Sequence, residues 1–183
     1  MFSQDTDILS VIGISTSFQI FARRIISLLL NYQENSSVKY VLLVSHGTIA
    51  PAMHETANAF FLGEREDLLH ANVAEGMGLE EYTDNVKKVL SVVGPKDGLI
   101  VIADLLGGSP LTYASYAINE MGLSKHTTFL TGMNLPLVID VLTRKDDVNH
   151  EFIGDEMVCE IRDSIGPFFL PKAEAVTSSE EDI

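Results

Sequence analysis

Three short loops of the sequence bring together a histidine, an aspartate, a serine and several glycines. They are Ser45-His46-Gly47-Thr48, Asp104-Leu105-Leu106-Gly107-Gly108-Ser109-Pro110 and Thr131-Gly132-Met133-Asn134-Leu135-Pro136. Each loop directly follows a run of residues that is typical of a buried strand. The carboxyl ends of parallel strands lie at one edge of a sheet, where functional loops gather. The three loops are therefore expected to form one rim.

His46 is the candidate nucleophile of this rim. An imidazole is near half-protonated around neutral pH, since its reference pKa is about 6.5. One ring nitrogen can attack phosphorus when a carboxylate holds the other nitrogen as a donor. Asp104 ends the third predicted strand, and a chain that reverses direction between its first and third strands makes those strands neighbours. We predict that Asp104 orients one nitrogen of His46 and leaves the other free to react.

The second loop has the composition of an anion-binding helix start. Gly107 and Gly108 permit close approach of the backbone, and Ser109 followed by Pro110 is typical of an N-cap and a first helical residue. A helix N-terminus attracts phosphate through its free N–H groups. We expect Gly107, Gly108 and Ser109 to bind a phosphoryl group. Thr48 and Asn134 are expected to wall the site or to contact a partner.

Each of these signals is weak when it stands alone, because a lone histidine, a turn aspartate or a helix-starting serine is usually structural. Their joint placement at three strand ends carries the prediction. The other four histidines are expected to be non-catalytic: His54, His70, His126 and His150. Cys159 is the only cysteine, so no disulfide can form within the chain and no cysteine metal cluster is expected.

The elements that position the loops alternate regularly along the chain. Strands are predicted at 40–44, 67–73, 99–103 and 127–130, and helices at 50–62, 79–93, 110–121 and 135–142, with Gly63 ending the first helix. This alternation predicts an α/β fold: a mainly parallel, open, doubly wound sheet with helices on both faces. After Asp147 the pattern weakens. A helix near 155–164 and a short strand at 168–170 are expected, and that strand is the candidate for an antiparallel C-terminal edge.

Residues 38–172 are predicted to form one domain, between an N-terminal extension at 1–37 and an acidic disordered tail at 173–183. The extension is apolar from Ile8 to Leu30 but contains Arg23 and Arg24, which argue against a spanning helix. Residues 18–30 suit an amphipathic or core-docking helix; the alternative is that the extension is not native to the mature protein. The formal net charge is −14, so nucleic acid is excluded as an expected partner.

Three motifs resemble the enzyme IIA domain of the mannose family of the bacterial phosphoenolpyruvate-dependent sugar phosphotransferase system. They are VLLVSHGTIAPAM at 41–53, IVIADLLGGSPLTYAS at 100–115 and LTGMNLPLVIDVL at 130–142. The resemblance covers residues 39–145. It has no counterpart for the first 37 residues and is loose after Asp147, which puts the dimer-forming C-terminal strand in doubt.

The resemblance implies a cytoplasmic phosphocarrier. His46 would accept a phosphoryl group from the phosphocarrier HPr, with Asp104 orienting the ring and Ser109 and nearby amides supporting the phosphoryl group. The group would pass to a separate IIB component, and then to sugar that enters through membrane IIC and IID components. A homodimer is implied, as is membrane association only through those partners, and no metal or organic cofactor is expected. The transported sugar is not specified.

Several other functions remain as alternatives. The phosphotransfer subunit of dihydroxyacetone kinase has a similar first domain. A tetrapyrrole metal chelatase would use His46 as a ligand, but no second ligand is evident. A serine hydrolase with Ser109, His46 and Asp104 lacks the Gly-x-Ser-x-Gly turn. A receiver-like switch phosphorylated on Asp104 would need acidic metal ligands after the first strand, where Val44-Ser45-His46 stands instead.

Overall fold

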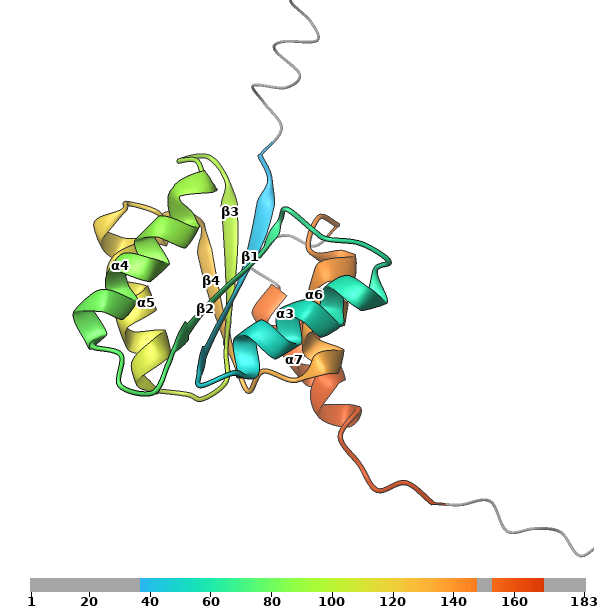
Figure 1. The fold of residues 1–183 in the computed structure, drawn as a ribbon. Coiled ribbons are helices and arrows are strands. Elements are labelled where there is room, and N and C mark those ends of the chain that lie inside the picture. The colour runs from blue at the N-terminus through green and yellow to red at the C-terminus, as the bar shows by residue number, and fades with distance from the viewer. Residues whose placement is uncertain (1–36, 148–152, 170–183) are drawn as a thin grey trace, which may run out of the picture.

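The computed structural model describes residues 37–147 and 153–169, and these form a four-stranded sheet with helices on both faces (Figure 1). The strands are β1 (Lys39–His46), β2 (Leu68–Val73), β3 (Gly98–Ala103) and β4 (Thr127–Thr131). Their order in the sheet is β2-β1-β3-β4, and every neighbouring pair is parallel. The chain thus reverses direction between β1 and β3. This confirms the predicted class and places the switch point where His46 and Asp104 lie.

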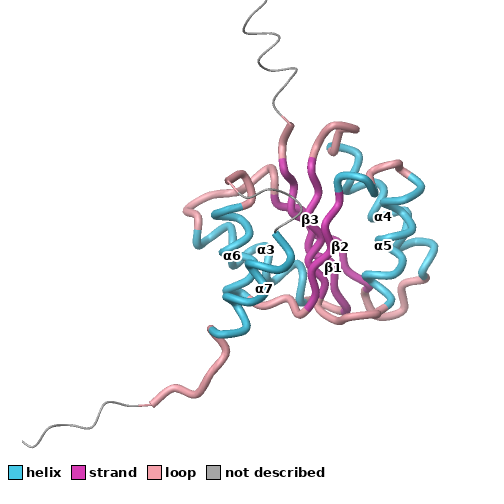
Figure 2. Tube along the Cα trace, turned by 180° about the vertical axis from the view of Figure 1, so that it is seen from behind, coloured by secondary structure: helices cyan, strands magenta, loops and turns pink. Residues whose placement is uncertain are grey.

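Two groups of helices cover the sheet (Figures 1 and 2). One face carries α4 (Leu79–Val89), which continues into the 3₁₀ turn η1 (Leu90–Val92), and α5 (Ser109–Glu120). The other face carries α3 (Ile49–Phe60), α6 (Leu135–Arg144) and α7 (Ile153–Asp163). A second 3₁₀ turn, η2 (Ser124–His126), precedes β4. Within the described residues, no helix is long and apolar enough to cross a lipid bilayer.

The core divides into two layers because successive strand residues point to opposite faces. Val41 and Leu43 of β1 pack with the helices α3, α6 and α7, whereas Leu42 and Val44 pack with α4 and α5. All six residues of β3 are buried. A central strand that is covered on both faces reads as a continuous apolar run, which is why β1 and β3 could be recognised from sequence.

The first helix ends differently from the prediction. Gly63 was expected to terminate it, but the helix stops at Phe60 and the residue with left-handed backbone is Leu62, with φ of 60°. Gly63 has no positive φ, and its N–H donates to the carbonyl of Asn58. The turn is therefore closed one residue earlier, at a residue for which the left-handed conformation is strained.

Two elements were predicted after Asp147: the helix is present, and the described residues contain no strand there. The helix expected near 155–164 is α7. Phe168 and Phe169 belong to no strand and are 85% and 79% exposed, and Leu170 lies outside the described residues. The sheet of the described residues is therefore entirely parallel, without the antiparallel edge strand left open by the sequence. The predictions for 1–36 and 173–183 also lie outside the described residues.

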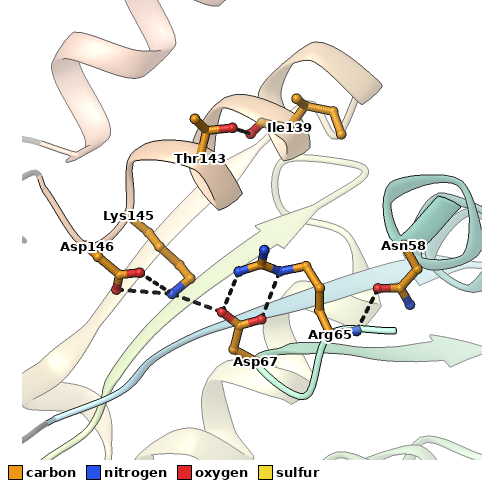
Figure 3. A network of polar contacts seen from close by, with 7 residues as sticks. All are labelled: Asn58, Arg65, Asp67, Ile139, Thr143, Lys145 and Asp146. Atoms are coloured by element: carbon orange, nitrogen blue, oxygen red, sulfur yellow. Dashed lines mark hydrogen bonds and ion pairs between the residues drawn. The ribbon is translucent and has the colours of Figure 1, made fainter. Parts of the chain in front are cut away.

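At the amino edge of the sheet, an ion-pair network around the buried Lys145 joins the segment before β2 to the end of α6 (Figure 3). Lys145 is 2% exposed, and its Nζ lies 3.0 Å from Asp67 and 2.8 Å from Asp146. Arg65 donates two hydrogen bonds to Asp67, of 2.9 and 2.7 Å. Lys39 Nζ donates to the carbonyl of Lys145 at 2.6 Å. This network closes the edge opposite the loops of the predicted site.

Candidate active site

His46 is the last residue of β1, and its ring is fixed by the aspartate at the end of β3. The Oδ2 atom of Asp104 accepts two hydrogen bonds from His46, one from the backbone N–H at 2.9 Å and one from Nδ1 at 3.0 Å. An ionised carboxylate can only accept, so Nδ1 carries the proton and Nε2 of the neutral ring keeps its lone pair. The predicted pairing of the two side chains is thus present, and Nε2 is the ring nitrogen that keeps a lone pair.

The side chains of His46 and Asp104 differ in exposure. The His46 side chain is 47% exposed, whereas that of Asp104 is 11% exposed. Asp104 is further held by its own backbone N–H, which donates to the carbonyl of Val44. Its second oxygen, Oδ1, is buried, with no hydrogen-bond partner among the described residues. A shielded carboxylate thus supports a ring whose other side is open to an incoming group.

Gly108 is in direct contact with the histidine ring. A Cβ atom built on Gly108 would lie 2.8 Å from His46 Cε1, closer than side-chain carbons pack. The backbone of Gly108 is ordinary, with φ of −67° and ψ of 156°. A side chain at this position would force the ring to shift, so the close approach of the ring favours glycine here more than the backbone conformation does. Gly107 is different, since its φ of 74° favours glycine on conformational grounds.

The start of α5 corrects one prediction. Ser109 was expected to be the N-cap, but the N-cap is Gly108, without a side-chain capping bond, and Ser109 is the first helical residue. Pro110 follows at the second position, where its missing N–H leaves nothing unsatisfied. Because Gly108 replaces a capping side chain, the first N–H groups of α5 stay available beside the ring. Ser109 is exposed.

Two side chains not predicted to matter hold the loop that carries His46. Ser45 is fully buried, and its Oγ accepts a hydrogen bond of 2.7 Å from the N–H of Ala50. Asn72, on β2, donates to the carbonyl of Gly47 at 2.7 Å. The only sequence signal for Ser45 was a hydroxyl at the end of an otherwise apolar strand. Asn72 gave no signal, since its partner is distant in the sequence.

Tyr82 supports the second loop from beneath. It is fully buried on α4, and its hydroxyl donates to the carbonyl of Pro110 at 3.1 Å. Burial raises the pKa of the Tyr82 hydroxyl strongly, and the negative charge of Asp104 adds to the shift. The tyrosine therefore stays protonated and remains a hydrogen-bond donor to the first turn of α5.

The third loop is joined to the second through the backbone. Met133 donates its N–H to the carbonyl of Ala103, which places the loop beside the end of β3. Asn134 is the N-cap of α6: its Oδ1 accepts from Leu137 and its Nδ2 donates to Gly132, both at 3.0 Å. Both polar ends of Asn134 are thus used within its own loop. Its predicted role as a site wall gains no described contact with the histidine.

Thr48 and Ser109 also lie at the rim without a described hydrogen bond to His46. Thr48 is the N-cap of α3, is exposed and makes no side-chain capping bond. No hydrogen bond between Ser109 and His46 is found in the described part of the chain. The arrangement therefore contains the histidine–aspartate pair and the helix start, but not the serine–histidine pair on which the hydrolase alternative depends.

The other histidines stand apart from this pair. His54 and His70 pack against each other on α3 and β2, with ring centroids 4.7 Å apart. Burial lowers the pKa of His70, and His54 adds to the effect. His126 ends η2, and His150 lies outside the described residues. Among residues 37–147 and 153–169, no three His, Cys, Asp or Glu side chains gather in a way that could hold a metal ion.

Comparison with known proteins identifies the family that the chain resembles. The EIIA-man family, described as "PTS system fructose IIA component", matches residues 40–156. The mannose-specific EIIAB component of the phosphotransferase system of Escherichia coli K12 is 25% identical over 107 residues, which are 58% of this chain and 32% of that protein. The corresponding protein of Shigella flexneri matches to the same extent. The match spans about a third of the length of these curated relatives.

Solved structures show the same fold. A IIA protein associated with the fucose utilization operon of Streptococcus pneumoniae has a TM-score of 0.59 and 25% identity, and the match covers 72% of this chain and 94% of that one. The mannose/sorbose-specific IIA subunit from Enterococcus faecalis has a TM-score of 0.61 with 21% identity, over 75% and 99% of the two chains. At that identity the second likeness concerns the fold alone.

Proposed function

Because the chain belongs to the EIIA-man family of phosphotransferase-system IIA components, we propose that it carries a phosphoryl group on Nε2 of His46 between two partner proteins. The observation that carries this proposal is the hydrogen bond of 3.0 Å between Nδ1 and Asp104, which leaves Nε2 as the only basic ring nitrogen. In line with the resemblance, the donor is the phosphocarrier HPr and the acceptor is a IIB component.

Transfer to the protein is a single displacement at phosphorus. The lone pair of Nε2 forms the new N–P bond while the bond between phosphorus and the donor breaks, and the electron pair of that bond leaves with the donor. The ring gains positive charge as the bond forms, and Asp104 stabilises it through the Nδ1–H hydrogen bond. No proton has to leave the ring. The same sequence in reverse, toward a different partner, returns His46 to its neutral form.

The start of α5 is suited to the charge on the transferred group. The oxygens of the phosphoryl group carry negative charge, and the N-terminal end of a helix is positive. Gly108 lies against the Cε1 atom, which is bonded to Nε2. We propose that the amides after Gly108 and the hydroxyl of Ser109 donate to these oxygens, with Gly107 shaping the turn before them.

The partners and cellular setting follow from the same proposal. The curated relatives are EIIAB components, whereas the match to this chain covers 32% of their length. We propose that membrane IIC and IID components receive the group through the IIB component, and that the protein works in the cytoplasm as a homodimer.

Phosphate transfer tests the proposal directly. The full chain is mixed with phosphoenolpyruvate, enzyme I and HPr, and the intact mass is measured for the wild type, His46→Ala and His126→Ala. We expect one acid-labile phosphoryl group on the wild type and on His126→Ala, and none on His46→Ala. Two-dimensional NMR of the labelled ring would place the group on Nε2. An unmodified wild type, or modification of His46→Ala, would refute the assignment.

A further inference from the structure

An open apolar groove follows the solvent side of α6, on the sheet face that also carries α3 and α7. Its volume is about 510 Å³. Leu135 and Ile139 of α6, Phe60 of α3 and Ile161 of α7 contribute to its lining. Phe60 is 62% exposed, which is unusual for a side chain of that size beside other apolar groups. The groove is distinct from the site of His46, and neither His46 nor Asp104 lines it.

The N-terminal extension has the composition that such a groove would accept. From Ile8 to Leu30 the only charged residues are Arg23 and Arg24. Between 18 and 30, the residues Phe18, Phe21, Ile25 and Leu28 recur at helical spacing and would form one apolar face. Arg24 falls at the side of that face and would flank a helix docked through it, whereas Arg23 falls on the opposite side of the helix.

The starting point of β1 places the extension within reach of the groove. Lys39 is the first residue of β1, and its Nζ donates a hydrogen bond of 2.6 Å to the carbonyl of Lys145. Lys145 directly follows Arg144, which lines one end of the groove. Residues 31–36 form a link that can span roughly 20 Å, and α6 itself is about 15 Å long. A segment that ends at Leu30 can thus lie along the whole of α6.

The charges at the rim also favour an arginine-bearing occupant. Arg144 is the one basic residue that lines the groove, and its guanidinium is shared by Asp140 and Glu160. Two carboxylates therefore share one cation, and the cluster of Arg144, Asp140 and Glu160 has a net negative charge. Arg24, at the side of the apolar face, would supply positive charge at this rim.

We propose that residues 18–30 of this chain dock as a helix into the groove between α3, α6 and α7 through the face of Phe18, Phe21, Ile25 and Leu28, with Arg24 beside the carboxylates at the rim. This contact covers the exposed ring of Phe60 and ties the extension to the phosphocarrier domain. It does not depend on the proposed phosphoryl transfer, because neither His46 nor Asp104 lines the groove, which meets the third loop only at Leu135 and Pro136.

Hydrogen exchange of the full chain tests the docking. Backbone amides between 21 and 28 should exchange at least about tenfold more slowly than those of a free peptide with the same sequence. Phe60→Asp and Thr143→Asp each put a carboxylate into the groove at an exposed position and should return these amides to within about twofold of the peptide rates. Val92→Asp is the matched control, because Val92 is 57% exposed and lies outside the groove, and it should retain the protection.

Four outcomes would overturn the proposal. Peptide-like exchange of residues 21–28 in the wild type would show that the segment does not dock, and equal protection in the groove variants would show that it docks elsewhere. Protection that disappears on dilution, together with a dimer mass by ultracentrifugation, would assign the groove to a second copy. Protection only in the presence of anionic lipid vesicles would assign the segment to a membrane surface. Circular dichroism confirms that each variant is folded.

Discussion

At the amino edge of the sheet, where the strands begin, Lys145 is 2% exposed and shares Asp67 with Arg65. At the carboxyl edge, where the strands end, the His46 side chain is 47% exposed and, among the described residues, is paired with Asp104 alone. The charges of the first edge satisfy one another, and they bind three elements together. Those of the second edge leave one oxygen of Asp104 and one nitrogen of His46 without described partners. The ion pairs of the amino edge thus stabilise the fold, whereas the side chains of the carboxyl edge keep polar atoms that a ligand could bind.

The largest effect should come from Asp67→Ala, and it should fall on stability alone. The substitution removes the carboxylate that Arg65 and Lys145 share, and it leaves the buried Lys145 with the exposed Asp146 as its remaining carboxylate partner. We expect the free energy of unfolding to drop by about 3 kcal/mol, measured by urea denaturation. Phosphoryl acceptance by the folded protein should stay at the wild-type rate, and a comparable loss of transfer would show that the two edges are not independent.

The same carboxylate predicts a pH dependence. Burial opposes ionisation of Asp67, but hydrogen bonds from Arg65 and Lys145 outweigh it and lower the pKa of Asp67. The stability from this ionisation is therefore present above about pH 4, the unfolded pKa, and is lost as the pH falls through the lower folded pKa. Asp67→Ala should flatten this acid loss. Lys87→Met, which breaks an exposed pair with Glu120, is the control and should leave the unfolding midpoint and its pH dependence unchanged.

At the carboxyl edge, Asp104→Asn should slow phosphoryl transfer and leave stability almost unchanged, which is the opposite of Asp67→Ala. The amide can still accept the backbone hydrogen bond of His46, but it is neutral and stabilises the positively charged ring poorly. We expect phosphoryl transfer to slow by about 10²-fold while the unfolding midpoint stays within a few degrees. Rapid-quench measurement of phosphorylation at saturating donor provides the rate, and a wild-type value would remove Asp104 from the role of orienting residue.

Gly108→Ala should have a smaller effect at the same edge, and it tests whether the contact of Gly108 with His46 matters. Gly108→Ala places a methyl group against His46 Cε1, so the ring must shift from its present position, and we expect transfer to slow by about tenfold. Gly78→Ala is a close control: Gly78 is the N-cap of α4 with φ of −71° and ψ of 150°, and nothing lies within 4 Å of an added Cβ. Both variants should change stability by a similar few tenths of a kcal/mol. Equal transfer rates in the two variants would show that the contact is unimportant.

The smallest expected effect is a change in stability, and it concerns the turn between α3 and β2. Leu62 holds a left-handed backbone and is 96% exposed, so Leu62→Gly should relieve strain and lose almost no burial. We expect a gain of about 0.5–1 kcal/mol in the free energy of unfolding, measured by thermal denaturation. Gly63→Ala should give no such gain, since Gly63 has no positive φ. A loss of stability in Leu62→Gly would mean that Leu62 has a contact beyond the described residues.

The carboxyl edge was easier to predict than the amino edge for a physical reason. His46 and Asp104 each stand directly after an apolar strand, so the periodicity that identifies the strand also locates the functional residue. Asp67, Arg65 and Lys145 look like ordinary surface charges in the sequence. Only their tertiary contacts reveal that Lys145 is buried, and no local pattern encodes which of several carboxylates it meets.

Local errors occurred where neighbouring residues compete for one role. Ser109 is chemically the better N-cap, yet Gly108 occupies that position because the His46 ring needs the space a side chain would fill. Gly63 is the better left-handed residue, yet Leu62 adopts that conformation. In both cases the propensity scale identified the right turn and missed its register by one residue.

The sequence by itself determined the α/β class, the three loops at strand ends and the candidate pair of His46 and Asp104, because these depend on residue type and short-range periodicity. The tertiary structure alone decided that β1 and β3 are hydrogen-bonded neighbours, that Nδ1 and not Nε2 faces the carboxylate, and that Gly108 must lack a side chain. Those facts depend on atoms brought together from distant parts of the chain, at distances that no local pattern specifies.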